Sequence, residues 1–378
     1  MFDPTPYRQL FPICERLAFF NHAGISPLNT RAAAAMRAFI ETSTSESSND
    51  YFPQVFRQRA ELCQSLANLI NARSADEIVP VQNTAYGINC AALSLPLRPG
   101  DNVLVIDGDY PANIYPWMNL AHRGVLTKFV PQHQGGVDLD LLVSRIDPRT
   151  RVIAVSTVMF ATGFRNPIEE IGRICKERGI YFVVDGIQSL GAFPLDVQAA
   201  GIDILSCGSQ KWLLGPIGAG FMYVRQELLS ELVPGAYVGT SSVVDAQNFL
   251  DYNFTLQPNA GRFAIGSDNI TGYIGLAESV ALIQEVGPAT IASQILSLVD
   301  TLIDDLGERG YRFSASTAPE HRSGIVIVEV DDPAAATARL KEAGIVVIPR
   351  GKGIRIAPHF YNTREEILRV GEALDRAL

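Results

Sequence analysis

The fold is decided by a stretch that reads SCGSQKWLLGP at residues 206–216. It follows GIDIL at residues 201–205, an apolar segment that is typical of a buried strand. After several glycines comes a second apolar run, FMYV, at residues 221–224. Lys211 therefore lies where one strand has ended and the next has not begun. A lysine taken alone is most often a solvated surface residue, so a role for Lys211 needs a partner elsewhere in the chain.

Such a partner occurs upstream, in the stretch YFVVDGIQ at residues 181–188. There Asp185 ends a strand that is apolar enough to be buried on both faces. An unpaired buried carboxylate is costly, so Asp185 needs a positive partner or several hydrogen bonds. A lysine that forms a Schiff base and an aspartate that holds a protonated pyridine nitrogen are the two protein groups that pyridoxal 5'-phosphate (PLP) requires. The spacing between Asp185 and Lys211 leaves room for one helix and one strand.

Together and in this order, VDGIQ at residues 184–188 and GSQK at residues 208–211 resemble the class V aminotransferase group of fold-type I PLP-dependent enzymes. That group includes alanine–glyoxylate aminotransferase, cysteine desulfurases, selenocysteine lyases and isopenicillin N epimerase. The resemblance implies an α/β fold in which a large domain with a mostly parallel seven-stranded sheet carries a small C-terminal α/β domain. It also implies that Lys211 holds PLP covalently and serves as the catalytic acid and base.

The composition suits a globular enzyme with a large core. The chain has 378 residues, of which 47% are hydrophobic and 19% charged. A net charge of −9 argues against nucleic acid as the main partner. No apolar run approaches the ~18–20 residues of a membrane span, and no secretory signal is visible. The five scattered cysteines predict reduced, mostly buried thiols in a cytoplasmic protein, and the dispersed histidines argue against a metal site.

The pattern along the chain predicts three parts. Residues 1–30 form an N-terminal arm that joins the small domain or the substrate pocket. Residues 31–260 form the large PLP-binding domain, in which residues 43–50 are polar enough to be a loop. Residues 261–378 form an interface segment, helices and the small C-terminal α/β domain.

A candidate phosphate site lies after the strand IVPV at residues 78–81. We expect Thr84 to be the N-cap of the helix that follows. Free N–H groups at a helix start bind phosphate, although this fragment taken alone favours a plain capped helix. The resemblance places the cofactor phosphate against residues of two turns: Asn83, Thr84, Ala85, Ser209 and Gln210.

The resemblance also assigns the residues around the pyridine ring. A buried strand at residues 102–107 leads to Tyr110, which falls where desulfurases carry a histidine stacked on the ring. Tyr110 is thus expected to stack on one ring face and Ile187 to pack on the other. Gln188 is expected to donate to the phenolic oxygen, and Asp185 to keep the ring nitrogen protonated. Without the stacking histidine, proton handling should differ from that in the desulfurases.

The segment GRFAIGSDN at residues 261–269 resembles a desulfurase segment whose Gly-Thr pair reaches the phosphate of the neighbouring subunit. Carried over, this makes Gly266 and Ser267 cofactor-binding residues of the partner's site. The protein would then be a homodimer whose sites are shared between chains.

The small amino-acid substrate is expected to meet Arg355, a charge within the apolar strand GIRIA at residues 353–357. The family has an arginine here that clamps the substrate α-carboxylate, and a guanidinium fork suits a carboxylate. The alternative is an edge-strand arginine that points to solvent. His22, in the N-terminal arm, and Thr157, where desulfurases carry an asparagine, are further substrate-binding candidates.

The resemblance leaves the reaction open. Desulfurases carry a catalytic cysteine upstream of the arginine matched to Arg355, whereas residues 339–352 contain no cysteine. A persulfide relay is therefore disfavoured, and we expect amino-group transfer at the α-carbon of an amino acid. A β-lyase acting on cysteine, selenocysteine or cystine, or an epimerase, remains the alternative. A binding protein without activity is disfavoured because Lys211, Asp185 and Arg355 are all present.

Overall fold

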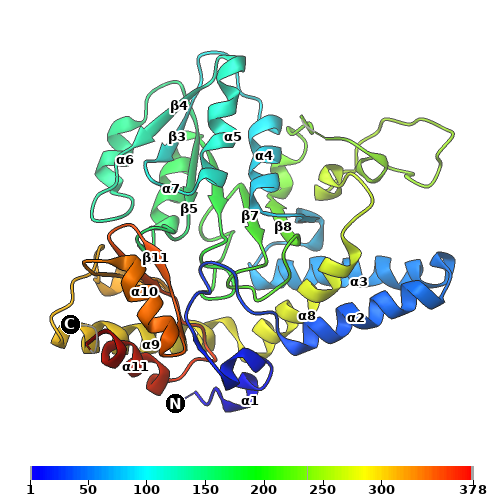
Figure 1. The fold of residues 1–378 in the computed structure, drawn as a ribbon. Helices are drawn as coiled ribbons and strands as arrows, with labels where there is room; N and C mark the ends of the chain where they lie inside the picture. The colour runs from blue at the N-terminus through cyan, green and yellow to red at the C-terminus, as the bar shows by residue number, and fades with distance from the viewer. Residues whose placement is uncertain (1, 236, 376–378) are drawn as a thin grey trace.

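The computed structural model describes residues 2–235 and 237–375, and its centre is a seven-stranded sheet (Figure 1). The strand order is β2-β8-β7-β6-β5-β3-β4. Strand β8 runs opposite to the other six strands, so the sheet is mostly parallel, as predicted. The strands are β2 (Ile78–Val81), β3 (Asn102–Ile106), β4 (Leu126–Val130), β5 (Thr150–Ser156), β6 (Tyr181–Asp185), β7 (Ile204–Gly208) and β8 (Gly220–Val224).

Each face of this sheet is covered by its own hydrophobic core. Alternate side chains of one strand enter different cores: Ile153 faces one, and its neighbour Ala154 the other. Because both faces are buried, the strands are apolar throughout, which is why they were recognisable in the sequence. One core is shared with α3 (Ser48–Leu69), α7 (Ile168–Arg178) and α8 (Ile270–Val286), and the other with α4 (Thr84–Ser94) and α5 (Tyr115–Met118).

A second, antiparallel sheet lies in the C-terminal part of the chain (Figure 1). Its order is β11-β12-β9, and it contributes to a third core with the helices around it. The N-terminal segment joins this part, because β1 (Ala18–Phe19) pairs in parallel with β10 (Ile345–Val346). The other elements here are β9 (Val326–Glu329), β11 (Ile348–Arg350), β12 (Gly353–Ile356), α9 (Pro288–Glu308), α10 (Pro333–Glu342) and α11 (Arg364–Asp375).

The loop expected at residues 43–50 is wrong in extent. Helix α2 (Thr30–Ser45) covers its first residues and α3 begins at Ser48, so only residues 46–47 lie between the two helices. The Ser47 hydroxyl accepts from Asn49 N and caps α3, so the polar residues serve as a helix start rather than a long loop. The remaining short helices are α1 (Thr5–Arg8) and α6 (Leu139–Arg145).

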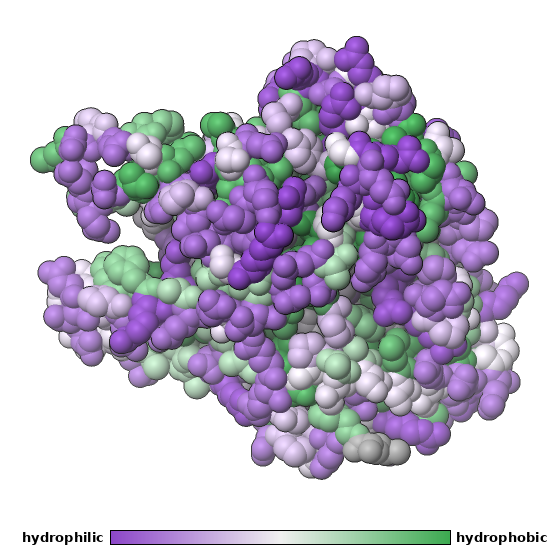
Figure 2. Space-filling model, turned by 180° about the vertical axis from the view of Figure 1, so that it is seen from behind, coloured by the Kyte–Doolittle hydropathy of each residue, from purple (hydrophilic) through white to green (hydrophobic). Residues whose placement is uncertain are grey.

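The segment of residues 237–254, which we call the apolar arm, projects beside the tip of α2 and α3 and carries exposed apolar side chains (Figure 1). Figure 2 shows hydrophobic atoms on this projection, at the left of that view. Its most exposed large residues are Tyr237, Phe249, Leu250, Tyr252 and Phe254.

Within residues 2–235 and 237–375, we find no single helix with the length and apolar character of a membrane span. Helices α8 and α9 meet those criteria only as a pair, and the pair is bent by 78°.

Candidate active site

The predicted site residues gather where the parallel strands of the large sheet end. Asp185 is the last residue of β6, and Lys211 lies in the turn after β7. Tyr110 follows β3, and Thr157 follows β5. Ligands of open α/β sheets bind at the carboxyl ends of the strands, so this edge is the expected position for a cofactor.

The turn that carries Lys211 is closed by its own hydrogen bonds. The Ser209 hydroxyl donates to Pro216 O at 2.7 Å, and Gly215 N donates to Ser209 O at 2.9 Å. Leu214 adopts a left-handed φ of 57°, a strained conformation for a non-glycine residue. These contacts hold Lys211 partly exposed, with its Nζ 5.3 Å from the centre of the Tyr110 ring. Burial lowers the pKa of Lys211, whereas Asp185 raises it.

Asp185 is buried with one carboxylate oxygen unused. Its Oδ1 accepts from Ile187 N at 2.9 Å, but Oδ2 has no hydrogen-bond partner. Burial raises the pKa of Asp185, while the bond from Ile187 opposes that shift. A buried carboxylate oxygen without a donor requires a ligand that supplies one. A protonated pyridine nitrogen is such a donor, so this side chain fits PLP.

The start of α4 is held against β7 as a cradle for an anion. Asn83 is the N-cap, since its side chain accepts from Tyr86 N at 2.9 Å. The cap expected at Thr84 is therefore one residue too late: the Thr84 hydroxyl accepts from Gly208 N at 2.9 Å. Ala85 follows, partly exposed, and the first N–H groups of α4 have no acceptor within the helix.

Gln210 closes this cradle from the other side. A Cβ added at Gly208 would meet Gln210 Oε1 at 2.6 Å, Ile187 Cδ1 at 3.3 Å and Thr84 Oγ1 at 3.4 Å. Gln210 Oε1 is buried and has no hydrogen-bond partner. The structure thus brings Thr84, Ile187 and Gln210 together around Gly208, a set that suits a phosphate beside an apolar ring. The hydroxyl of Ser209, by contrast, is engaged within its own turn.

The loop that carries Tyr110 is fixed by an acid that the sequence analysis missed. Asp109 is buried, and its carboxylate accepts from Tyr110 N at 2.7 Å and from Asn113 Nδ2 at 3.0 Å. It also accepts from the backbone and the hydroxyl of Ser156. Burial raises the pKa of Asp109. Tyr110 itself is 43% exposed and meets the edge of Phe160 at 5.1 Å.

Gln188 and Thr157 make contacts within the protein that support the site. Gln188 Oε1 accepts from Trp212 Nε1 at 2.9 Å, and its Nε2 donates to Ala23 O at 3.1 Å. The Thr157 hydroxyl donates to Asp185 O at 3.3 Å. Gln188 thereby ties the lysine turn to the N-terminal segment, and Thr157 steadies the end of β6. Their contacts to cofactor and substrate stay predictions.

Arg355 is a buried cation without an anionic partner. It is 2% exposed, and its Nη atoms donate weakly to Phe160 O at 3.4 Å and to Asn21 Oδ1 at 3.3 Å. Its Nε has no partner, and no ion pair involves Arg355 within the described part of the chain. Burial lowers the pKa of Arg355 to about 10, so the guanidinium stays charged at neutral pH. A buried guanidinium of this kind is poised for a carboxylate.

His22 lies far from Arg355 in the sequence but next to its strand in the fold, where its contacts serve the structure. Its ring is fully buried, with Nδ1 2.7 Å from Ala357 O and Nε2 2.6 Å from the Tyr361 hydroxyl. Burial holds its pKa well below the usual value. The structure directs this ring to Tyr361, and the neighbouring Asn21 contacts Arg355 instead. Asn21 could have been noticed as the polar residue beside the predicted candidate.

Gly266 and Ser267 form an exposed left-handed turn before α8. Their φ angles are 110° and 51°, and Ser267 is solvent-exposed. Among the hydrogen bonds of residues 2–235 and 237–375, none joins this turn to Thr84 or Lys211. Their predicted role toward a neighbouring subunit stays a prediction.

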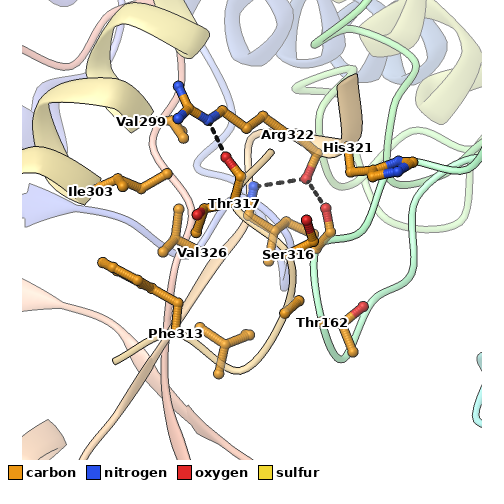
Figure 3. Close-up of a pocket in the computed structure, with 14 residues that line it drawn as sticks. Thr162, Val299, Ile303, Phe313, Ser316, Thr317, His321, Arg322 and Val326 are labelled. Carbon is orange, nitrogen blue, oxygen red and sulfur yellow. Dashed lines mark hydrogen bonds between the residues drawn. The ribbon is translucent and has the colours of Figure 1, made fainter. Parts of the chain in front are cut away.

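A separate small cavity lies between α9, β9 and the turn at residues 159–165 (Figure 3). Its volume of about 20 Å³ is enough for roughly one water molecule. Arg322 crosses its rim and donates to Thr317 O at 2.7 Å. This cavity is too small for an amino-acid substrate.

No thiol or metal cluster completes the site in the described residues. All five cysteines are free, and Cys207, on β7, is fully buried, which raises its pKa well above the usual value. The other four lie on α3, α4, α7 and the N-terminal segment. No group of three potential metal ligands occurs within residues 2–235 and 237–375.

Comparison with known proteins agrees with this geometry. The family model for aminotransferase class-V matches residues 18–370. The chain is 30% identical to a probable cysteine desulfurase of Methanothermobacter thermautotrophicus, over 97% of this chain and 96% of that protein. It is also 27% identical to the uncharacterized aminotransferase YcbU of Bacillus subtilis, over 96% of this chain and 95% of that protein.

Two solved structures are similar over almost their full length. The apo cysteine desulfurase of Thermococcus onnurineus NA1 matches with a TM-score of 0.90 and 25% identity, covering 100% of this chain and 99% of that one. The cystine C-S lyase C-DES, in complex with cysteine persulfide, matches with a TM-score of 0.88 and 26% identity, covering 96% and 98%. The family match, the fold and the unpaired buried acceptors of Asp185 and Gln210 all point to the same cofactor. The chain belongs to the aminotransferase class-V family, and its cofactor is pyridoxal 5'-phosphate.

Proposed function

We propose that this protein is a β-lyase that cleaves the Cβ–S bond of a cysteine-derived amino acid. The relatives with an assigned reaction are cysteine desulfurases and a cystine lyase, which supports the lyase alternative over the amino-group transfer expected first. The products would be a keto acid, ammonia and the sulfur-containing leaving group.

The observation that carries the proposal is the absence of a usable thiol near Lys211. A desulfurase that stores sulfur on its own cysteine needs a reactive thiolate at the substrate. Cys207 is 0% exposed, and burial raises its pKa, so it stays protonated and out of reach. The sulfur must therefore leave with its own substituent rather than pass to the protein.

The chain's own groups can perform such an elimination. When bound, PLP withdraws electrons from the substrate α-carbon. Lys211, whose amine is favoured in its neutral form by burial, takes the α-proton. Arg355 holds the α-carboxylate, and Tyr110 covers the reacting groups from one side. Asp185 would hold the protonated pyridine nitrogen through its unused Oδ2, and that charged donor would keep the carboxylate ionised.

The bond changes balance without an added oxidant. The α-proton goes to Lys211, and the Cβ–S bond breaks with both electrons on sulfur. Water then supplies the keto oxygen of pyruvate, and the amine departs as ammonia. With cystine, the leaving group is cysteine persulfide, the product named for the similar lyase C-DES.

We further propose a homodimer in which Gly266 and Ser267 complete the partner's phosphate site. The exposed turn at Ser267 and the exposed apolar arm (Figure 2) support this, since a second copy would cover both. The five free cysteines support a cytoplasmic location.

The test is acceptor dependence. The purified holoenzyme is incubated with L-cystine, with and without 2-oxoglutarate, and pyruvate is measured, with Lys211→Ala as the inactive control. We expect pyruvate without any acceptor. Glutamate formed from 2-oxoglutarate with no pyruvate would establish amino-group transfer instead, and inversion at the α-carbon with neither product would establish an epimerase.

A further inference from the structure

A second arginine stands beside Arg355 on the small antiparallel sheet. Arg350 ends β11 and pairs with Gly353 of β12, two residues before Arg355. Side chains two apart on a strand share a face, and directly paired residues share it too. Arg350 and Arg355 are therefore diagonal neighbours on one face, with only a glycine between them. Diagonal neighbours of this kind lie about 7–8 Å apart, within reach of long side chains.

Within the described residues, no acidic side chain neutralises either arginine. The salt bridges of the described residues include neither Arg350 nor Arg355. Each has a buried Nε without a hydrogen-bond partner. Arg350 also lowers the pKa of both Arg355 and Lys211, after the larger effect of burial. Two close cations with unused donors are unfavourable unless anions bind to them.

The two guanidinium groups contact different parts of Phe160. Arg355 donates to the backbone oxygen of Phe160, whereas Arg350 lies over its ring, 5.3 Å from the centre. The Phe160 ring also packs edge-to-face with Tyr110, and Nζ of Lys211 lies over the Tyr110 ring. From Lys211 the contacts thus run through Tyr110 and Phe160 to Arg350, while Arg355 lies to the backbone side.

We propose that Arg350 binds a second anionic group of the substrate, carried on the leaving sulfur, while Arg355 binds the α-carboxylate. The inference rests on the proposed lyase function and narrows its substrate class to cysteine conjugates with an anionic sulfur substituent. The carboxylate of the distal half of cystine and the sulfonate of S-sulfocysteine share this chemistry. Arg355 is held on the backbone side of Phe160 by its contacts to Phe160 O and Asn21, whereas Arg350 lies over the ring, so each arginine offers its own position for an anion.

The kinetic test compares anionic and neutral leaving groups. Pyruvate release by the holoenzyme is measured with L-cystine, S-sulfo-L-cysteine and S-methyl-L-cysteine. We expect Arg350→Gln to lower the ratio of kcat/KM for the anionic substrates over S-methylcysteine by about tenfold or more, mainly through KM, because a charged pair is lost. Lys352→Gln removes the same charge from the exposed turn next to Arg350 and should keep the ratio.

Comparing the two anionic substrates shows whether the site prefers the carboxylate of cystine or the sulfonate of S-sulfocysteine, because the preferred substrate has the higher kcat/KM in the wild type. An equal loss for all three substrates in Arg350→Gln would show that both arginines hold one carboxylate and would overturn the proposal. A wild-type enzyme that releases no pyruvate from any of them fails the lyase function instead, which is a separate result.

A binding experiment tests Arg350 without turnover. Glutarate and butyrate are titrated into the holoenzyme, and the visible cofactor band reports binding. We expect glutarate to bind about tenfold more tightly than butyrate in the wild type and in Lys352→Gln, and the ratio to approach one in Arg350→Gln. Equal affinities in the wild type would refute the second anion site, whatever reaction the enzyme catalyses.

Discussion

At the level of single residues, the site is defined by buried polar atoms that the protein leaves without partners. Asp185 Oδ2, Gln210 Oε1 and Arg355 Nε are all of this kind. Such groups are rare in folded proteins because each costs desolvation energy. Their convergence on one end of the sheet is what distinguishes this region from ordinary surface.

The first prediction concerns Lys211. Replacing it with alanine should abolish the covalent attachment of the cofactor, because no other lysine lies in this turn. Mass spectrometry after borohydride treatment should then show no mass increase, and the visible band should change. Lys352→Ala, on the exposed turn after β11, is the matched control. A mass increase that persists in Lys211→Ala would remove this lysine from the site.

The second prediction concerns pH and His359. Phe360 N donates to Nδ1 of this buried ring, and its Nε2 donates to Trp212 O, so the fold requires the neutral form. Burial lowers the pKa of His359 to about 4 from 6.5. The unfolded chain therefore binds more protons in this range. The stability that the neutral ring contributes is complete above pH 6.5 and is lost as the pH falls toward 4.

Urea unfolding at pH 7 and at pH 4 checks this. Relative to His359→Gln, the wild type should lose about 3 kcal/mol of unfolding free energy across that range. The exposed His122→Gln should keep the wild-type slope. If His359→Gln loses as much as the wild type, the ring is not held neutral by the fold.

Some residues of the site could be predicted from the sequence, and others could not. Lys211 and Asp185 were predictable because their chemistry is marked by local context, a charge at the end of an apolar strand. Asn21, Asp109 and Arg350 were not, since their importance comes from contacts with distant residues. Asn21 meets Arg355 across 334 positions, a pairing that no local pattern specifies.

At the level of elements, the cofactor end of the sheet depends on how closely α4 approaches β7. Gly87 of α4 lies against Ser206 of β7, where an added Cβ would come within 2.8 Å of the serine Cβ. The Ser206 hydroxyl donates to Thr84 O at 2.9 Å. This glycine is therefore required for contact rather than for backbone freedom.

The third prediction follows from that contact. Gly87→Ala should push α4 away from β7, displace Thr84 and Asn83, and weaken PLP binding by about tenfold, a loss of ~1.4 kcal/mol. Its gain in helix propensity, up to ~1 kcal/mol, would not offset the clash. Cofactor affinity is measured by titrating the apoenzyme with PLP.

Gly307→Ala on α9 is the control, because nothing lies within 4 Å of a Cβ added there. It should leave PLP affinity unchanged and raise thermal stability slightly. Unchanged PLP affinity in Gly87→Ala would mean that α4 does not position the phosphate.

The strands of the large sheet were predictable from their continuous apolar runs, whereas helix starts were less so. Thr84 and Asn83 are both good caps by type. Thr84 does not cap α4, because its hydroxyl accepts from Gly208 N of β7 instead. This tertiary contact overrides the local preference of threonine for the cap. Polar residues near Ser47 likewise suit a loop or a helix start.

At the level of the whole molecule, the fourth prediction tests the shared site. In the proposed dimer, Lys211→Ala disables the chain's own site, while Ser267→Glu places a negative charge against the partner's phosphate. Each variant alone should be inactive. A mixed dimer would keep one intact site, because one chain supplies Lys211 and the other Ser267.

Unfolding and refolding an equal mixture of the two variants should restore about a quarter of the wild-type activity, since half the dimers are mixed and each has one good site. Each variant refolded alone is the control. If the mixture stays inactive while Ser267→Glu alone is inactive, Ser267 acts within its own chain.

The N-terminal segment also bears on how the protein is made. The ring of His22 can form its hydrogen bond with Ala357 O only after Ala357 has been synthesised, 335 residues later. At ribosomal speeds of about 5–20 residues per second, that delay is roughly 15–70 seconds. During translation the first segment must stay unpaired or be shielded by chaperones, and Arg355, the predicted carboxylate-binding residue, is synthesised only near the end. A nascent chain stalled before its last strand would thus contain the lysine turn without the arginine that we predict to hold the amino acid.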